Sequence, residues 1–234
     1  MKSWATKNGI IIHQIVIGFT NCFLVQQGDL LILVDSGRSK SIEKYITELK
    51  FLINGKPTID YLILTHTHFD HCTHAALFAK LFSPEVIVHR KEAGFLSNGF
   101  KPLPGGTLWF IDKLTALGNK YSAHKYTYAP LTADILIDDE YEFSENDLKI
   151  KIISTPGHTI GSISVIIDDE IALVGDAMTG HLKFTIFPPF ADDTVNLVKS
   201  WGKLLETDCQ IFIPGHGGEV KRSVVQKHYL KYNQ

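Results

Sequence analysis

Short apolar runs, many of them β-branched, alternate with amphipathic stretches along the whole chain. Apolar runs bounded by turn residues predict strands near 10–18, 21–27, 30–35, 61–66, 84–89, 148–154, 162–167, 171–175 and 210–213. Apolar residues at helical spacing predict helices near 40–52, 73–82, 193–205 and 219–231. Each half of the chain therefore has strands followed by helices. This order favours an α/β fold of two sheets packed face to face, with helices on the outer faces.

An apolar stretch at about 91–135 interrupts this pattern. Gly105 and Gly106, with prolines before them, divide it into a loop and a short helix near 107–118. One interpretation is an insertion that packs on the outside as extra core. Another is a roof over a ligand pocket, or a dimer contact. The aromatic and proline-rich segment 184–190 predicts a second apolar wall.

The composition is that of a globular protein, with 44% hydrophobic and 21% charged residues. We expect one domain spanning residues 1–234, because this length suffices for a substantial core. The net charge of −2 offers no electrostatic attraction for nucleic acid. Residues 1–8 lack the apolar core of a signal peptide, and no apolar run is long enough to span a membrane. Cys22, Cys72 and Cys209 form no CxxC pair, which indicates reduced thiols and a cytoplasmic protein.

Candidate metal ligands are concentrated where apolar runs end. His66-Thr67-His68-Phe69-Asp70-His71 directly follows the apolar run 61–64 and offers four ligands within six residues. Two near copies of one device, Thr155-Pro156-Gly157-His158 and Ile213-Pro214-Gly215-His216, each present a histidine after a β-branched run. Asp176 follows the run 171–175 in the same way. A polar turn with Asp70 as a helix cap is the alternative for the first motif.

The number of these donors predicts two metal ions. Five imidazoles and two carboxylates exceed the three or four protein ligands that one tetrahedral ion needs. Two ions roughly 3.5–4 Å apart, bridged by a carboxylate and a water, would use all of them. Imidazole and carboxylate ligands suit zinc, and also iron or manganese. We therefore expect a metal-dependent enzyme.

The same residues resemble the metallo-β-lactamase-fold hydrolase superfamily, from Asp35 in Leu33-Val34-Asp35-Ser36-Gly37 through His216. The resemblance implies an αββα sandwich of two mixed sheets with helices on the outer faces. It also implies that His66, His68 and His158 hold one ion, that Asp70, His71 and His216 hold the other, and that Asp176 bridges them. Asp35 resembles the family's structural aspartate beside the metal site, with a simple strand-end turn as the alternative.

The ligand set predicts hydrolysis. A hydroxide bridging two ions would attack a substrate whose oxygen binds one of them. Asp70 would orient that hydroxide and help return a proton to the leaving group. We expect Thr179 and His181 to line the site, because both follow Asp176 closely. We expect the substrate to be a small carboxylic ester, lactone or thioester, with no nucleic-acid or membrane partner.

Within the superfamily, the ligand set is most similar to the glyoxalase II and lactonase-like branch. Three positions depart from it: Thr73-His74 replaces the usual Gly-Gly of glyoxalase II, and Thr179 replaces the tyrosine of acyl-homoserine lactonases. A phosphodiesterase and a mononuclear iron oxidoreductase similar to persulfide dioxygenases remain alternatives. A partner-binding protein without catalytic activity is a third, and metal content and substrate panels would discriminate among them.

Overall fold

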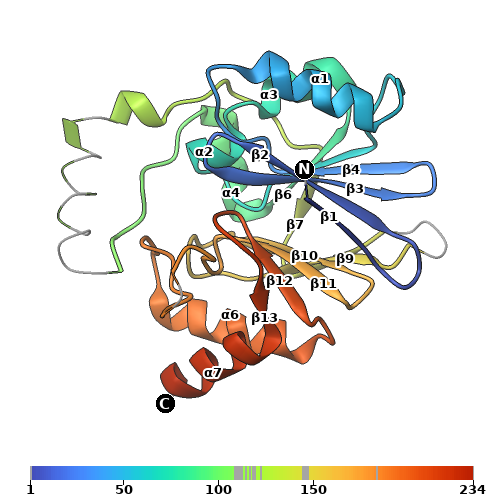
Figure 1. The fold of residues 1–234 in the computed structure, drawn as a ribbon. Helices are drawn as coiled ribbons and strands as arrows, with labels where there is room; N and C mark the ends of the chain where they lie inside the picture. The colour runs from blue at the N-terminus through green and yellow to red at the C-terminus, as the bar shows by residue number, and fades with distance from the viewer. Residues whose placement is uncertain are drawn as a thin grey trace.

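Two β-sheets lie face to face, and helices cover their outer faces (Figure 1). The computed structural model describes residues 2–107, 113, 115, 117, 120–121, 123–143, 148–182 and 184–233. Both sheets mix parallel and antiparallel neighbours. The predicted α/β class and the αββα sandwich are thus confirmed.

Among the described residues, the first sheet has its seven strands in sequence order. They are β1 (Lys2–Ala5), β2 (Ile11–Ile17), β3 (Thr20–Gln27), β4 (Leu30–Val34), β5 (Tyr61–Ile63), β6 (Glu85–His89) and β7 (Ile135–Ile137). The first four pair antiparallel through short turns, and β4 to β7 pair parallel. Parallel neighbours need crossover connections. Here these contain α1 (Ile42–Leu52), α2 (Phe69–Cys72), α3 (Ala75–Phe82), α4 (Arg90–Asn98) and the 3-10 turn η1 (Ala123–Tyr126).

The second sheet has six strands in the described part of the chain, in the order β13-β12-β11-β10-β9-β8. Their bounds are β8 (Glu140–Glu142), β9 (Ile150–Ser154), β10 (Ile163–Ile167), β11 (Ile171–Gly175), β12 (Ile211–Pro214) and β13 (Val220–Lys221). The one parallel pair recorded, β11 with β12, is connected through α6 (Thr194–Glu206). The last helix is α7 (Arg222–Tyr232), and α6 and α7 cover the outer face of this sheet (Figure 1).

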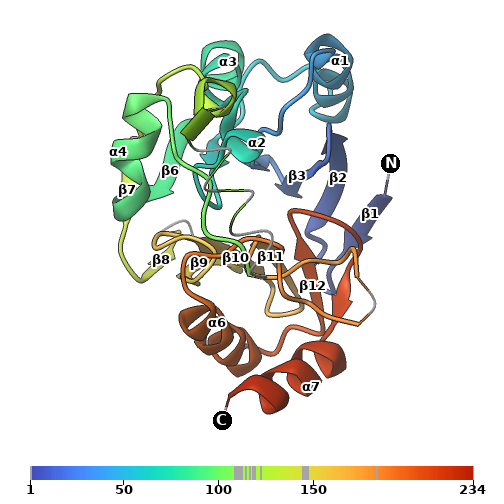
Figure 2. The same ribbon diagram turned by 90° about the vertical axis from the view of Figure 1, so that its left-hand side faces the viewer.

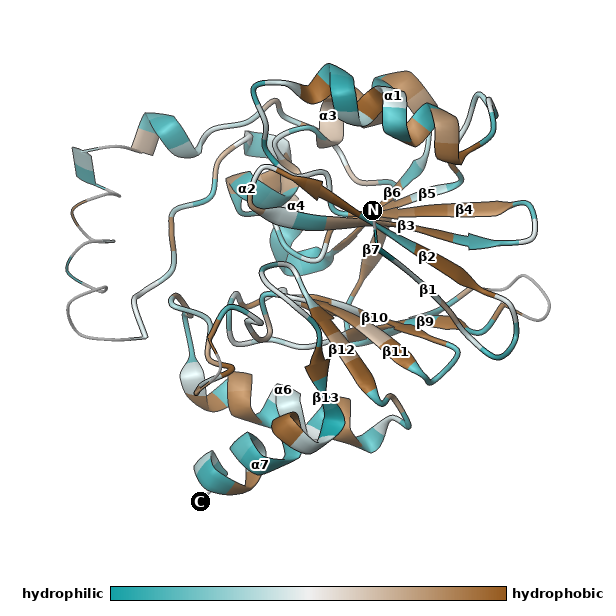
Figure 3. Cartoon of the chain, in the orientation of Figure 1, coloured by the Kyte–Doolittle hydropathy of each residue, from teal (hydrophilic) through white to brown (hydrophobic). Residues whose placement is uncertain are grey.

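Three apolar clusters hold the four layers together. Between the sheets, residues such as Phe23 and Ile63 of the first meet Val165 and Leu173 of the second. The opposite faces of the same strands pack against α1 and α3 on one side and α6 on the other. Strand side chains alternate between faces, so strands buried on both faces are apolar throughout. Figure 3 shows this as continuous hydrophobic colour along the central strands.

Several elements differ from the sequence-based expectation. β1, β7, β8 and α4 were not predicted, and the short α2 precedes the predicted helix near 73–82. The three strands are only three or four residues long. β1 and β8 are largely polar, and β7 is apolar but too short to give a strand pattern. The final helix begins at Arg222 instead of near 219, because Val220 and Lys221 pair with β12.

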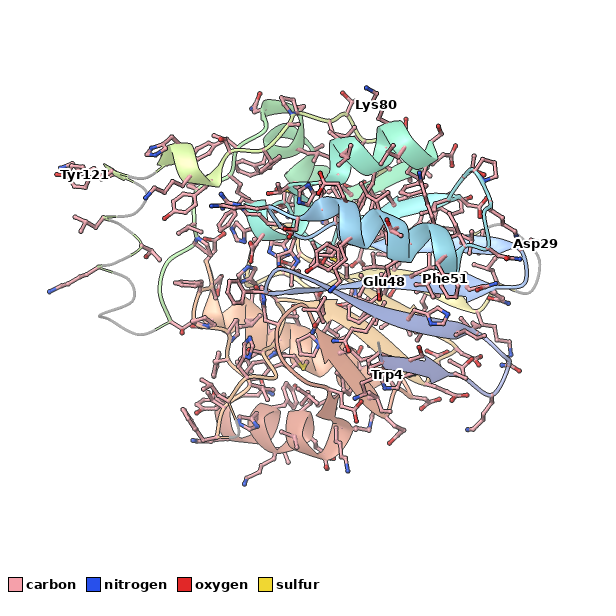
Figure 4. All side chains as sticks on the ribbon, turned by 45° about the horizontal axis from the view of Figure 1, so that its top comes forward. Trp4, Asp29, Glu48, Phe51, Lys80 and Tyr121 are labelled. Carbon is pink, nitrogen blue, oxygen red and sulfur yellow. The ribbon has the colours of Figure 1, made fainter. Side chains whose placement is uncertain are left out.

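The stretch 91–135 is part core and part projecting segment. Leu96 of α4 and Tyr128 are buried in the cluster between α3 and the first sheet, as the extra-core interpretation expects. Described residues around Tyr121, which is 65% exposed, extend away from the layers (Figure 4). Most of the predicted helix near 107–118 lies outside the described residues. Among the described helices, none has both the length and the apolar character needed to cross a bilayer.

Candidate metal centre

The candidate ligands gather at one edge of the sandwich, where strands of both sheets end. β5 leads into the His66–His71 segment, β9 into His158, β11 into Asp176 and β12 into His216. In Figure 2 this edge faces the viewer, with α2 at its centre. The two sheets are tied together here, since the N–H of Ile163 in β10 donates to the Thr65 carbonyl at 2.9 Å.

The seven predicted ligands form three overlapping groups. The groups are His66, His68 and His158; His66, His71 and Asp176; and Asp70, His71 and His216. Within each group the donor atoms lie within 4.8 Å of one another. The segments that carry them are far apart in the chain, so only folding brings all seven together.

In the first group, His68 Nδ1 lies 2.9 Å from His158 Nε2. The ring of His66 is 4.7 Å, centroid to centroid, from each of these rings. All three side chains are buried, and His66 Nε2 has no hydrogen-bond partner among the described residues. Polar atoms buried in this way are rarely left unpaired. Converging imidazole nitrogens without a partner fit a cation-binding site.

In the group of Asp70, His71 and His216, the Nε2 of His216 lies 3.2 Å from both His71 Nε2 and Asp70 Oδ2. Asp176 lies between the two groups. Its Oδ1 is 3.4 Å from His71 Nε2, and its Oδ2 is 3.5 Å from the Nε2 atoms of both His158 and His216. Asp176 Oδ1 is buried and unpaired in the described structure. The position of Asp176 therefore fits the bridging role that the family resemblance implies.

Hydrogen bonds to the far side of three rings orient their Nε2 atoms toward the centre. Nδ1 of His158 donates to the Phe190 carbonyl at 2.7 Å, and Nδ1 of His216 to the Phe19 carbonyl at 2.8 Å. Nδ1 of His71 donates to Asp35 Oδ2, also at 2.8 Å. A protonated Nδ1 leaves the Nε2 lone pair free for a metal. The second-sphere bonds that metal-ligating histidines usually make are thus present.

Asp35 does more than form a turn at the end of a strand, because its carboxylate accepts three hydrogen bonds at the site. Its carboxylate is buried and accepts the Thr65 N–H and the Thr65 hydroxyl, each at 2.8 Å, in addition to His71. The Asp35 backbone has φ of +60°, a conformation that aspartate tolerates better than most residues. The alternative for Asp70 is wrong: the N-cap of α2 is His68, which makes no side-chain capping bond.

The electrostatics favour the deprotonated, ligand-competent form of His66, His68, Asp70 and Asp176, and they hold a proton on His216 that a bound cation would displace. Burial lowers the pKa of His66 and His68, and neighbouring imidazoles lower it further. Burial raises the pKa of Asp70, but His71 and His216 outweigh it and bring the pKa to about 2. The pKa of Asp176 also falls well below its usual range for the same reasons. Burial lowers the pKa of His216, but Asp176 and Asp70 outweigh it and raise the pKa to about 9.

The two Pro-Gly-His segments use glycine for close approach. A Cβ on Gly215 would lie 2.5 Å from His71 Cε1 and 2.8 Å from Asp176 Oδ1. A Cβ on Gly157, whose φ is +136°, would lie 2.4 Å from the backbone of Leu197 in α6. Glycine therefore lets each histidine loop pack tightly against its neighbours at the centre.

A cavity of about 380 Å³ opens onto the donors. It is lined by His68, Phe69, Asp70, Leu103, Pro104, His158, Asp176, Met178, Thr179, His181, Pro188, Pro189, Phe190 and His216. Thr179 and His181 both line it, and the His181 ring stacks 6.3 Å from that of His216. A larger cavity, of about 820 Å³ beside Trp4 and Asp168, contains none of the seven donors. The smaller cavity is the one placed for chemistry.

Both predicted walls contribute to this cavity. Leu103 and Pro104 come from the stretch 91–135, and Pro188 to Phe190 come from the segment 184–190. Phe184, at the start of that second segment, is instead 79% exposed.

Three supporting residues were not identified from the sequence. The Asn21 side-chain amide donates to the Pro214 and Gly217 carbonyls, each at 2.9 Å, and so fixes the His216 loop to the first sheet. A polar residue inside the apolar run of β3 was the available signal. Glu92 and Lys101 form a buried ion pair behind the first ligand group. They gave no signal, because neither α4, which carries Glu92, nor its pairing with Lys101 was predicted.

Comparisons with known proteins agree with the fold described above. The model of the metallo-beta-lactamase superfamily matches residues 15–216. "Probable metallo-hydrolase MJ0888" of Methanocaldococcus jannaschii is 29% identical over 203 residues, which is 85% of this chain and 87% of that protein. Among solved structures, an archaeal superfamily protein from Sulfolobus tokodaii has a TM-score of 0.68 at 21% identity, covering 95% of this chain and 86% of that one. The BLEG-1 B3 metallo-beta-lactamase has a TM-score of 0.71 at 23% identity, covering 95% of this chain and all of that one.

Proposed function

This chain belongs to the metallo-beta-lactamase superfamily, and from this premise we propose that it is a hydrolase with two divalent metal ions. Its substrate is a small carboxylic ester, lactone or thioester, as in the glyoxalase II and lactonase-like branch. Zinc is the ion that a histidine-rich donor set favours, with iron and manganese as alternatives. We also propose a reducing compartment such as the cytoplasm, supported by three buried, unpaired cysteines.

One observation carries the two-ion proposal. Asp176 lies next to donors of the first and the third ligand group. Its oxygens are 3.4–3.5 Å from the Nε2 atoms of His71, His158 and His216. A single ion bound by His66, His68 and His158 would leave Asp70, His71 and His216 without a role. These three residues nonetheless converge, and they are held by Asp35 and the Phe19 carbonyl.

Different residues of the cavity have different roles in the proposed hydrolysis. Divalent ions held there supply Lewis acidity, which lowers the pKa of water and polarises a carbonyl. Asp70 faces the cavity and is 29% exposed, so its carboxylate reaches a water there. It is placed to orient that water, accept its proton and return a proton to the leaving group. His181, whose ring stacks on His216 at the cavity wall, is placed to contact the substrate.

The cavity supports an uncharged carboxyl substrate over a phosphodiester. Leu103, Pro104, Met178 and Phe190 give it apolar walls, and no lysine or arginine is among its described lining residues. Phosphate recognition usually adds arginine or lysine to pair with the phosphate oxygens.

We expect the protein to bind two ions per chain, because seven donors exceed the needs of one. Elemental analysis of protein purified without added metal, and again after zinc supplementation, measures this. Fully loaded preparations that hold a single ion would contradict the prediction. One iron per chain in such preparations would instead favour the mononuclear oxidoreductase.

We expect kcat/KM for a simple aryl ester or lactone to exceed that for a bis-aryl phosphodiester at matched metal content. The apolar walls accommodate acyl and alkyl groups, and no lysine or arginine is described in the cavity to pair with phosphate. Both substrates are compared on one preparation, with chelator-treated protein as the control for metal-independent turnover. More efficient phosphodiester cleavage would refute the carboxyl-ester assignment.

A further inference from the structure

The buried carboxylate of Glu92 belongs to none of the candidate ligand groups. It links the two chain segments that carry the first group, which is His66, His68 and His158. We propose that Glu92 is a positioning residue that sets the affinity of the His66, His68 and His158 group for its ion. In this proposal Lys101 compensates the charge of Glu92 and holds the cavity wall to the same network. The inference rests on the proposed function, since it concerns how that metal centre is held.

The contacts of Glu92 connect three parts of the chain. Its Oε2 accepts the N–H of Thr67 at 3.0 Å and also the Thr67 hydroxyl. Its Oε1 accepts a hydrogen bond from the Thr159 hydroxyl at 2.9 Å and another from Lys101 Nζ. Thr67 lies between His66 and His68, and Thr159 directly follows His158. One carboxylate from α4 therefore fixes the spacing between the two loops that carry the first ligand group.

This network is fully enclosed. Glu92, Thr67 and Thr159 have no exposed surface, and Lys101 is 4% exposed. Gly161 permits the close approach, because a Cβ there would lie 2.6 Å from Glu92 Cγ. In such surroundings hydrogen bonds hold geometry firmly, and an unpaired group is costly. Because the network is buried, a change at Glu92 would alter the positions of the ligand histidines.

Charge balance behind the ligands also depends on the pair. The Lys101 ammonium lies against Glu92 and 4.6 Å from the centroid of the Phe95 ring. Because Glu92 accepts from Thr67, between His66 and His68, and also from Lys101, the Lys101 charge lies behind the first ligand group. A cation acting on these rings disfavours a second cation bound to them, and Glu92 offsets that charge. Neutralising Glu92 alone would expose the first ligand group to the full charge of Lys101.

Lys101 extends the network to the cavity wall. It precedes Leu103 and Pro104, which line the cavity, by two and three residues. The Tyr128 hydroxyl strengthens the same region through its contacts with the Thr67 and Phe95 carbonyls, at 2.9 and 3.1 Å. The wall and the first ligand group are thus held by one set of buried contacts.

The test is the zinc affinity of Glu92→Gln, measured by competition with a chromophoric chelator. Glutamine keeps the volume but supplies one acceptor oxygen instead of two and carries no charge. We expect the affinity of the His66, His68 and His158 group to fall about 10- to 100-fold, the usual cost of losing an outer-sphere partner. The other group should change little. Histidine ring ¹⁵N resonances that shift at each step of the titration identify the group being filled.

The control is Arg90→Gln, which removes an exposed ion pair with Asp138 from the same helix and should leave both affinities unchanged. Unchanged affinity of the first group in folded Glu92→Gln, or an equal loss at both groups, would overturn the inference. If Glu92→Gln does not fold, Thr159→Val removes one of the same bonds at nearly constant volume. It should weaken the first group in the same direction, and wild-type affinity would again overturn the inference. A wild-type protein that binds no divalent ion would refute the proposed function itself.

Discussion

Replacement of Asp70 by asparagine is expected to lower kcat by at least about 100-fold, with a smaller change in KM. The carboxylate faces the cavity, and its Oδ2 lies 3.2 Å from His216 Nε2. Asparagine keeps the shape but cannot accept and return a proton at neutral pH. The effect should therefore fall on the chemical step and not on substrate binding.

Steady-state kinetics on an ester that the wild-type protein hydrolyses would measure this change. Metal content is determined on the same preparations, because Asp70 is also a candidate ligand, together with His71 and His216. A variant that retains both ions and a near-normal kcat would show that Asp70 has no part in proton transfer. Thr73→Ala, at the end of the same helix and with a hydroxyl that donates to the Phe69 carbonyl, is a matched control that should retain activity.

Replacement of Asp35 by asparagine is expected to weaken ion binding by the Asp70, His71 and His216 group about 100-fold. Asp35 Oδ2 now accepts from both His71 Nδ1 and the Thr65 hydroxyl. An asparagine amide that keeps its oxygen on the Thr65 N–H presents its NH₂ to His71. The His71 ring would then take the tautomer protonated at Nε2, which has no lone pair for a metal.

Zinc competition and the histidine ¹⁵N resonances also report this change, since the protonated ring nitrogen of His71 should switch from Nδ1 to Nε2. Asp134→Asn is the matched control, because Asp134 likewise accepts a backbone N–H, from Val86 at 2.8 Å, but contacts none of the donors. An unaltered His71 tautomer with normal affinity would contradict the role given to Asp35. Its own φ of +60° does not complicate the test, because asparagine tolerates that conformation well.

Much of the fold was accessible from local pattern. The strands around Phe23, Val165 and Leu173 contain apolar runs where both faces are buried, and such runs are visible in sequence. The helix α6 was also predictable, because its buried residues, such as Leu197 and Trp201, recur at helical spacing. By contrast, β7 and β8 are three residues long, and their existence depends on pairing with β6 and β9.

The sequence by itself determined the candidate metal ligands of this protein. The His-x-His-x-Asp-His motif and the two Pro-Gly-His segments name the seven donors, because metal ligation demands specific side chains and these stand out against apolar strands. Only the tertiary structure decided how they are held. Asp35, Asn21 and Glu92 act on partners 36, 193 and 67 residues away in the chain. The partners of these side chains cannot be assigned from local pattern, since a buried polar side chain is explained by its neighbours in space and not by its neighbours in sequence.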